Sequence, residues 1–375
     1  MLLDEFTRSG LTGRGGAGFP AARKLSAANV SRESRMWASS PIIVANGAEG
    51  EPRSVKDATL LHHAPHLVLD GLLAAASAVG ASSLYIYAPA RALSGVRSAM
   101  RERRDTRSIT LVEARESFIS GEATAVVNAI ENGIALPTDR TQHLTTTGIR
   151  RRPTLVHNVE TLAHVGLVAR YGANWFRSVG SERDPGTRLV TVSGHLEREQ
   201  VLEIAGHAML SDVLVSSGID LTSVSAVLVG GYHGTWIGRD HLDANLSAGG
   251  LAKFGATPGA GIIFVLGTHE CGLAATAKIV RFLADESARQ CGPCMFGLPE
   301  MARLFERVAA GDRDHDLSRQ LDRLGRSVIG RGACHHPDGT ARLVSSALDT
   351  FAADVDAHVI GRCRRSNPPT GGDRG

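Results

Sequence analysis

Pro41-Ile-Ile-Val-Ala-Asn-Gly-Ala-Glu-Gly-Glu-Pro52 joins a short apolar run to a turn-rich loop that carries two carboxylates. The apolar run is typical of a buried strand, and Asn46-Gly47 is typical of the turn that ends one. Open α/β sheets bind ligands at the carboxyl ends of their strands, so this loop is a candidate binding loop. A solvated acidic turn would account for the same residues equally well.

The alternation of strand and helix continues on both sides of this stretch. The expected elements are helices over 65–79, 92–104 and 122–132 and strands over 84–88 and 109–113. Strands and helices that alternate at these lengths predict a layered sheet with helices on its faces, which we assign to residues 1–178.

Two further units are expected after this α/β unit. Strand-like residues 187–193, 201–204 and 226–229 enclose a short helix at 210–217, which predicts a small α+β domain of β-grasp type over 186–266. Four helical stretches then predict an antiparallel bundle over 267–362, at 272–285, 298–309, 317–324 and 341–358. The polar, Pro- and Gly-rich end, 363–375, is expected to be disordered.

Composition excludes several classes of protein. Of 375 residues, 43% are hydrophobic and 21% charged, which is the balance of a globular chain rather than a disordered or collagenous one. A net charge of +3 does not favour nucleic-acid binding. No apolar stretch approaches the roughly 20 residues of a spanning helix, and the first residues do not resemble a signal peptide. We therefore expect a cytoplasmic protein without direct membrane insertion.

The cysteine pattern points to an inorganic centre. Cys291-Gly-Pro-Cys294 aims two thiolates at one centre, and Cys334 lies between later helices that can return to it. Zinc and iron–sulfur clusters both use this spacing. A thioredoxin-like redox pair is disfavoured, because no βαβ pattern precedes the motif.

A glycine-rich loop near the start is a candidate anion site. Gly13-Arg-Gly-Gly-Ala-Gly-Phe-Pro20 lets backbone N–H groups approach an anion, and Arg14 and Lys24 can add positive charge. Phe19 can anchor the loop or offer its face to a planar ring. A flexible surface loop is the alternative interpretation.

Two more loops carry candidate ligand residues. Phe118-Ile-Ser-Gly-Glu-Ala-Thr124 opens a helix at Gly121 and Glu122, where a glutamate can also be a plain helix cap. Val156-His-Asn-Val-Glu-Thr161 offers Asn158 and Thr161, although polar residues are also common at the start of a helix.

In this order, the motifs resemble the flavin- and NADH-binding F-type subunit of respiratory complex I and related subunits of NAD-linked hydrogenases and formate dehydrogenases. The resemblance rests on residues 10–20, 44–52 and 158–162 and on Glu286-Ser-Ala-Arg-Gln-Cys-Gly-Pro-Cys294. It implies an FMN-binding domain, a β-grasp domain and a bundle with a 4Fe–4S cluster. It also implies NADH:acceptor oxidoreductase chemistry and partners that are other electron-transfer subunits or ferredoxin-like proteins, peripheral to a membrane complex.

The resemblance also implies roles for individual residues. FMN contacts would fall on Gly13, Arg14, Gly15, Lys24, Asn46, Gly121, Glu122, Asn158 and Thr161. Glu51 and Phe19 would lie beside the nicotinamide dinucleotide, and Cys291, Cys294 and Cys334 would bind the cluster.

Several positions depart from the family pattern. The first cysteine of the cluster motif is Ala288, and family carboxylates are replaced at Ala48 and Ala123. Along a predicted helix, Cys271 lies on the order of 25 Å from position 288, and Cys363 lies near the tail. His335 or His336, or water, would have to complete a cluster, while three cysteines and a histidine would also suit zinc. Two hypotheses follow: a diverged electron-transfer subunit, or a non-catalytic scaffold with a degenerate flavin site and a structural Cys/His metal site.

Overall fold

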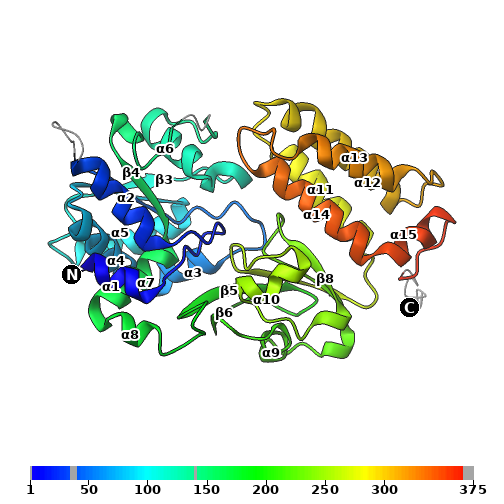
Figure 1. Cartoon of the computed structure of the whole chain (residues 1–375), viewed down its shortest axis with the longest axis horizontal. Helices are drawn as coiled ribbons and strands as arrows, with labels where there is room; N and C mark the ends of the chain where they lie inside the picture. Colours follow the sequence, from blue (N-terminus) through cyan, green and yellow to red (C-terminus); the bar gives the residue numbers. More distant parts are fainter. Residues whose placement is uncertain (1, 34–39, 139–141, 366–375) are drawn as a thin grey trace, which may run out of the picture.

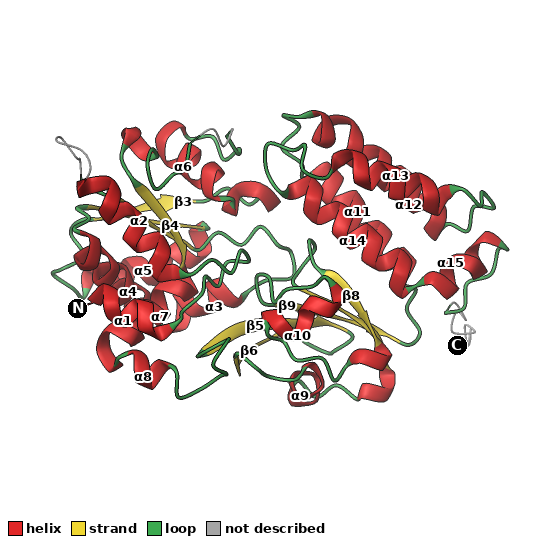
Figure 2. Cartoon of the chain, in the orientation of Figure 1, coloured by secondary structure: helices red, strands yellow, loops and turns green. Residues whose placement is uncertain are grey.

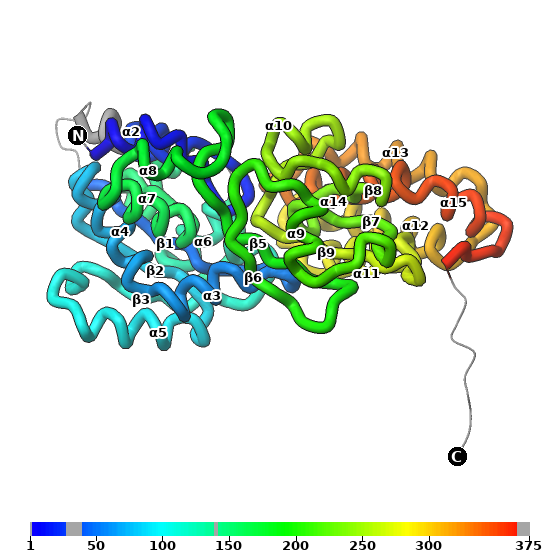
Figure 3. Tube along the Cα trace, turned by 90° about the horizontal axis from the view of Figure 1, so that it is seen from below, coloured from blue at the N-terminus to red at the C-terminus, as the bar shows by residue number. Residues whose placement is uncertain are grey.

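The computed structural model describes residues 2–33, 40–138 and 142–365, with two sheets and a group of C-terminal helices (Figures 1 and 2). Of the expected disordered tail, residues 366–375 lie outside the described residues, whereas 363–365 are placed. Along the longest axis, the N-terminal α/β unit occupies one end and the C-terminal helices occupy the other (Figure 3). Among the described residues, no helix is both long and apolar enough to cross a membrane.

The first sheet is parallel and has the order β3-β2-β1-β4. Its strands are β1 (Ile42–Asn46), β2 (Ser83–Ala88), β3 (Ile109–Glu113) and β4 (Thr154–Asn158). The chain runs outward from β1 to β3 and then returns to place β4 on the other side of β1. This reversal makes the carboxyl ends of β1 and β4 a topological switch point, where open α/β sheets bind ligands. Asn46 and Asn158 are directly paired there.

Helices cover this sheet on its faces, as the alternating pattern predicted. They are α1 (Leu2–Ser9), α2 (Ala21–Glu33), α3 (Lys56–His63), α4 (Pro65–Val79), α5 (Ala90–Arg101), α6 (Ala123–Asn132), α7 (Val159–Tyr171) and α8 (Ala173–Phe176). Helix α4 begins at Pro65, whose fixed φ suits a first helical turn, and ends at Gly80 in the left-handed conformation. It packs on α7 so closely that a Cβ at Gly71 would lie 1.7 Å from the carbonyl oxygen of Leu162.

The second sheet is mixed, with the order β6-β5-β9-β7-β8. It contains β5 (Thr187–Gly194), β6 (Gln200–Ala205), β7 (Val224–Val229), β8 (Thr235–Gly238) and β9 (Ile262–Gly267), with α9 (Leu210–Ser216) and α10 (Ala248–Leu251) beside it. Its side chains alternate between two cores. Val227 and Val265 pack toward α9, whereas Leu228 and Phe264 pack toward the C-terminal helices.

The C-terminal helices are α11 (Gly272–Asp285), α12 (Leu298–Ala309), α13 (Leu317–Val328), α14 (His336–Thr350) and α15 (Ala352–Val359). The prediction of a single helix over 341–358 is wrong in two respects. It begins earlier, at His336, with Pro337 in its first turn, and it breaks at Phe351, whose φ of −107° and ψ of 26° are not helical. The break allows α15 to turn away from α14 (Figure 1).

Candidate functional site

The carboxyl ends of β1 and β4 form the centre of the site. The Asn46 side chain donates to the carbonyl oxygen of Gly121 at 2.9 Å, which fixes the loop before α6 against this edge. The Asn158 amide donates to Asp57 at 2.5 Å, while its oxygen accepts from the backbone of Glu160 and caps α7. Both asparagines therefore order the loops around the switch point.

The glycine-rich loop lies directly over this edge. The backbone N–H of Arg14 donates to the Thr161 hydroxyl at 2.8 Å. A Cβ at Gly15 would lie 3.0 Å from the Cβ of Asn158, so a larger residue would push the loop away. Gly16 adopts a φ of 108° and faces the backbone of Gly259 and Ala260, beyond the second sheet's β8. The glycines thus leave exposed backbone close to both sheets.

Arg14 uses its side chain within the protein. Its guanidinium donates to the carbonyl oxygens of Thr187 (2.9 Å) and Pro185 (3.3 Å) and to the hydroxyl of Thr12. It is 4% exposed, and burial lowers its pKa to about 10. The guanidinium therefore joins the glycine-rich loop to the start of β5.

Lys24 carries a part-buried positive charge beside β4. Its Nζ donates to the carbonyl oxygen of Val156 at 2.5 Å, and burial lowers its pKa although the charge of Glu122 opposes this. His157 is buried beside it, and burial together with the Lys24 charge lowers the histidine pKa to about 3. Its Nε2 has no hydrogen-bond partner among the described residues. A part-buried ammonium at this edge suits an anionic ligand group.

Glu122 is a helix cap in this structure. Its carboxylate accepts from the backbone N–H groups of Thr124 (2.7 Å) and Ala125 (3.1 Å), at the first turn of α6. Gly121 lies beside it, where a Cβ would be 3.0 Å from the carbonyl oxygen of Ala48.

Phe19, at the end of the glycine-rich loop, is 50% exposed, and the guanidinium of Arg23 lies 5.8 Å from its ring centroid.

Glu51 reaches from the first unit to the second sheet. Both carboxylate oxygens lie 3.1 Å from the backbone nitrogen of Tyr232, in the turn after β7. Gly231, with a φ of 89°, leaves room for it, because a Cβ there would lie 2.6 Å from Oε1. Burial raises the pKa of Glu51 to about 8, so the protonated form dominates at neutral pH.

Sequence reasoning missed a buried ionic network at the same edge. Lys56 Nζ lies 2.6 Å from Asp57 and 2.8 Å from Glu160, and all three are almost fully buried. Burial raises the pKa of Asp57 to about 7, whereas Lys56 holds that of Glu160 at about 2 against the effect of burial. The sequence has lysine at only four positions, so Lys56 was the residue that could have drawn attention to this network.

The two cysteine-bearing stretches meet at the end of the helical bundle. The Cys291 sulfur accepts from the backbone of Ala333 and of Cys294, and these bonds lower its pKa against the effect of burial. Burial, then the charge of Cys291 and that of Cys334, raises the pKa of Cys294 to about 12. The backbone N–H of Arg289, which has a φ of 53°, points to Cys294. The Cys291, Cys294 and Cys334 thiols therefore lie close enough to influence one another, together with backbone N–H donors to Cys291 and Cys294.

The Cys291 and Cys294 side chains are within hydrogen-bond reach of each other, but the three sulfurs do not all lie within 4.8 Å of one another. Among the residues that the structure describes, the group whose ligand atoms all lie within 4.8 Å is a different one, Cys271, His358 and Cys363. Zinc–thiolate bonds of about 2.3 Å would bring sulfurs to about 3.8 Å from each other.

The two histidines after Cys334 differ in what they can do. His336 is buried, with Nε2 2.7 Å from the carbonyl oxygen of Leu283 and Nδ1 3.1 Å from His233. Both ring nitrogens are engaged, so His336 is wrong as a fourth ligand. His335 is exposed and has Nδ1 3.2 Å from Asp338, an arrangement that leaves Nε2 for a metal.

One loop connects the switch point to the cysteines. Phe118 donates its backbone N–H to the Glu286 carboxylate at 3.0 Å, just before the cysteine motif. The Phe118 ring packs against His233 and His336, with centroids 4.9 and 5.3 Å away. Loop 117–122 therefore touches both candidate sites, because Asn46 binds it from the other side.

Comparison with known proteins places this geometry in a family. The Nuo51 FMN-binding domain model matches residues 6–167, and the NADH-ubiquinone oxidoreductase-F iron-sulfur binding region matches 274–358. The chain is 28% identical to the NADH-quinone oxidoreductase F subunit 2 of Rhizobium meliloti, over 96% of this chain and 88% of that protein. It is equally identical to the NADH-quinone oxidoreductase F subunit of Mycobacterium tuberculosis, over 94% and 83%.

A solved structure agrees with the sequence matches. The air-oxidized NAD+-reducing nickel–iron hydrogenase superposes with a TM-score of 0.86 at 27% identity, over 96% of this chain. This chain spans 62% of the length of that hydrogenase chain. The two family models together match well over half of the sequence. The chain belongs to the family of NADH-quinone oxidoreductase F subunits, with its FMN-binding domain and its iron–sulfur binding region.

Proposed function

We propose that this chain is an electron-transfer subunit that passes electrons from NADH through FMN and a 4Fe–4S cluster to a partner. The observation that carries the proposal is loop 117–122. Asn46 binds this loop at the switch point, and Glu286 binds it at the start of the cysteine motif. Two candidate cofactor sites that share one loop are suited to electron transfer between them.

The switch-point residues fit an anionic flavin. The backbone N–H groups of Gly15 and Gly16 and the Lys24 ammonium would hold the phosphate. Asn46 and Asn158 would order the ring site, and Glu51, whose pKa is raised by burial, would lie toward the nicotinamide. When bound, FMN accepts a hydride from NADH, and an iron–sulfur cluster carries single electrons onward.

The bundle end fits a cluster with three cysteine ligands. Cys291, Cys294 and Cys334 would each bind an iron, and the backbone N–H groups beside them would lower the charge on sulfur. The Ser287 hydroxyl is buried with no partner in the described part of the chain and can donate to a sulfur. Ala288 leaves one iron for His335 or for water.

We place the electron-transfer partner beside this centre. Met295 and Phe296 follow Cys294 directly and are 52% and 72% exposed. Ile329 is 54% exposed. It follows Val328, the last residue of α13, which packs against Gly297 in the turn that carries Met295 and Phe296. Exposed apolar side chains are typical of protein interfaces. We infer a partner subunit or ferredoxin-like protein there, in the cytoplasmic part of an assembly.

Anaerobic purification followed by visible and EPR spectroscopy tests this function. We expect a yellow-brown protein that releases FMN on denaturation, bleaches on titration with NADH and shows a reducible cluster signal. A colourless protein without flavin, whose zinc disappears in Cys334→Ser, would instead establish the scaffold hypothesis. The Cys334→Ser arm is needed because a second thiol site lies at the other end of the bundle.

A further inference from the structure

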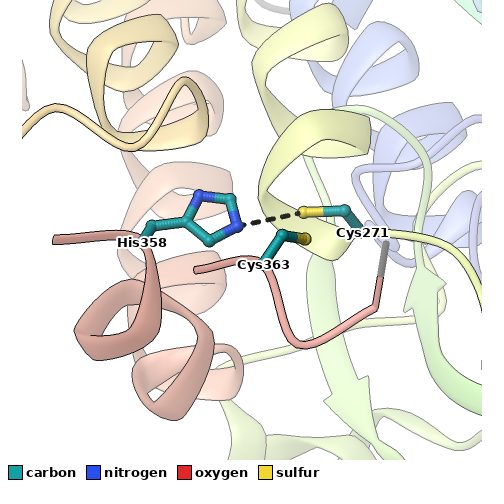
Figure 4. A group of neighbouring side chains, drawn as sticks. All are labelled: Cys271, His358 and Cys363. Atoms are coloured by element: carbon teal, nitrogen blue, oxygen red, sulfur yellow. Dashed lines mark hydrogen bonds between the residues drawn. The ribbon is translucent and has the colours of Figure 1, made fainter. Parts of the chain in front are cut away.

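Three metal-ligating side chains meet at the end of the bundle opposite to the cluster site (Figure 4). Cys271 lies just before α11, His358 lies in the last turn of α15 and Cys363 follows that helix. Their ligand atoms all lie within 4.8 Å of one another, although Cys271 and His358 are 87 residues apart. None of these residues belongs to the cysteine motif described above.

His358 presents the nitrogen that a metal requires. Its Nδ1 lies 3.1 Å from the carbonyl oxygen of Val308, which can only accept, so Nδ1 carries the proton. Nε2 then has its lone pair directed to the Cys271 sulfur, 3.7 Å away (Figure 4). A histidine that donates its second N–H to a carbonyl is the usual arrangement at protein metal sites.

Backbone donors at the start of α11 reach the Cys271 sulfur. Its sulfur accepts from the backbone N–H groups of Leu273 and Ala274 in the first turn of α11, where the helix dipole favours negative charge. Burial and the nearby charge of Cys363 raise its pKa in the absence of a cation. Two thiols in contact thus need a shared proton or a shared positive ion.

The segment after α15 is held in the position that brings Cys363 to this place. Arg365 donates to the carbonyl oxygen of Thr268 at 3.3 Å, and its Nε lies 3.9 Å from the buried carboxylate of Asp354. Asp354 precedes His358 by one helical turn. The chain around Cys363 therefore already lies against α15 and against the loop that precedes α11.

The distances suit a single tetrahedral ion. Zinc bonds of about 2.3 Å to sulfur and about 2.0 Å to nitrogen place a sulfur and a nitrogen about 3.6 Å apart across the tetrahedral angle. The 3.7 Å between the Cys271 sulfur and His358 Nε2 matches this value. Two thiolates and a neutral imidazole would also balance the charge of a divalent cation.

We propose that Cys271, His358 and Cys363 bind one zinc ion, with water in the fourth position. The ion fastens the end of the described chain to the start of α11 and holds α15 on the bundle. This site is independent of the proposed electron transfer, because its ligands lie at the other end of α11 from Cys291.

Zinc analysis of the full-length protein, purified anaerobically with added zinc, tests the site. We expect about one zinc per chain that survives dialysis, and a zinc-edge X-ray absorption spectrum with two sulfur ligands. Cys363→Ser and His358→Gln should lose this zinc while the iron content stays unchanged. His315→Gln is the matched control, because this exposed histidine near α15 lies outside the group.

Three results would overturn the proposal. One is wild-type protein without retained zinc, and another is zinc that persists with two sulfur ligands in Cys363→Ser. The third is a Cys271–Cys363 disulfide recovered by peptide mapping of the anaerobic protein. Loss of iron alone would contradict the proposed electron transfer and leave the zinc site standing.

Discussion

The two ends of helix α11 carry cysteines in contrasting environments. Beyond its C-terminal end, the sulfurs of Cys291, Cys294 and Cys334 do not all lie within 4.8 Å of one another, and Cys291 and Cys294 receive backbone N–H groups close to the loop of Phe118. At its N-terminal end, Cys271 and Cys363 share a compact site with His358. The 14 residues of α11 span about 21 Å, so the two sites are separate. Residue type alone does not decide the chemistry; the spacing of the sulfurs and the neighbouring donors do.

The largest expected effect comes from removing one thiol at each end. Cys334→Ser should abolish nearly all bound iron, because the loss of one of three protein ligands leaves a cluster too weakly held. Cys363→Ser should leave iron and the EPR signal unchanged. Metal analysis of both variants measures this contrast. Equal iron loss in the two variants would show that the ends are not independent.

An ionisable group between the first unit and the second sheet, Glu51, gives a further contrast with the distant end of the bundle. Burial raises the pKa of Glu51 from 4.5 to about 8, so the folded state binds a proton more tightly than the unfolded state. Stability should therefore be greatest below pH 4.5, as far as this group is concerned, and fall as pH rises toward 8. The slope can reach about 1.4 kcal/mol per pH unit.

Glu51→Gln should remove that slope, because a neutral amide oxygen can still accept from Tyr232. Thermal melts at pH 6 and pH 8.5 should show the variant gaining relative to the parent at the higher pH. Glu199→Gln is the matched control, since this glutamate is exposed. An unchanged difference between the two pH values would contradict the raised pKa.

Local pattern was sufficient to predict β1, β2, β3 and the candidate loops around them, whereas β4 and the helix α7 that follows it were not expected. The run 41–45 and the turn after it identified β1, and the structure places the predicted loops of Gly15, Asn46, Gly121 and Asn158 together. Their convergence follows from parallel strands ending at one edge. Strand β8 was missed because four residues give too little periodicity.

What could not be predicted depends on contacts between residues remote in sequence. The break at Phe351 arises where its ring packs against Gly272, at the start of α11. The ionic network of Lys56 and Glu160 and the meeting of Cys271 with Cys363 are likewise tertiary. The distance estimate along the helix did place Cys271 away from position 288, but it gave no reason to look for a second site.

The next effect concerns the positive charge beside β4. Lys24→Ala should weaken FMN binding by roughly 10- to 100-fold, the value of one charge-assisted hydrogen bond in a buried site. Fluorescence titration of the apoprotein with FMN measures the affinity. Lys253→Ala is the control, because that lysine is exposed and contacts Phe254. The zinc content at the far end should not change in either variant, and equal FMN affinities would remove Lys24 from the site.

The smallest effect comes from making the cluster end richer in thiols. Ala288→Cys would complete a C-x2-C-x2-C series with Cys291 and Cys294 and cover the remaining iron, so the cluster should survive air several-fold longer. The appearance of the three-iron EPR signal after oxidation measures this lifetime, and Ala288→Ser separates the thiol from the added volume. An unchanged lifetime would mean that the iron is already covered. In that case His335→Gln tests the histidine, because this substitution shortens the lifetime of the cluster only if the His335 imidazole is the fourth ligand.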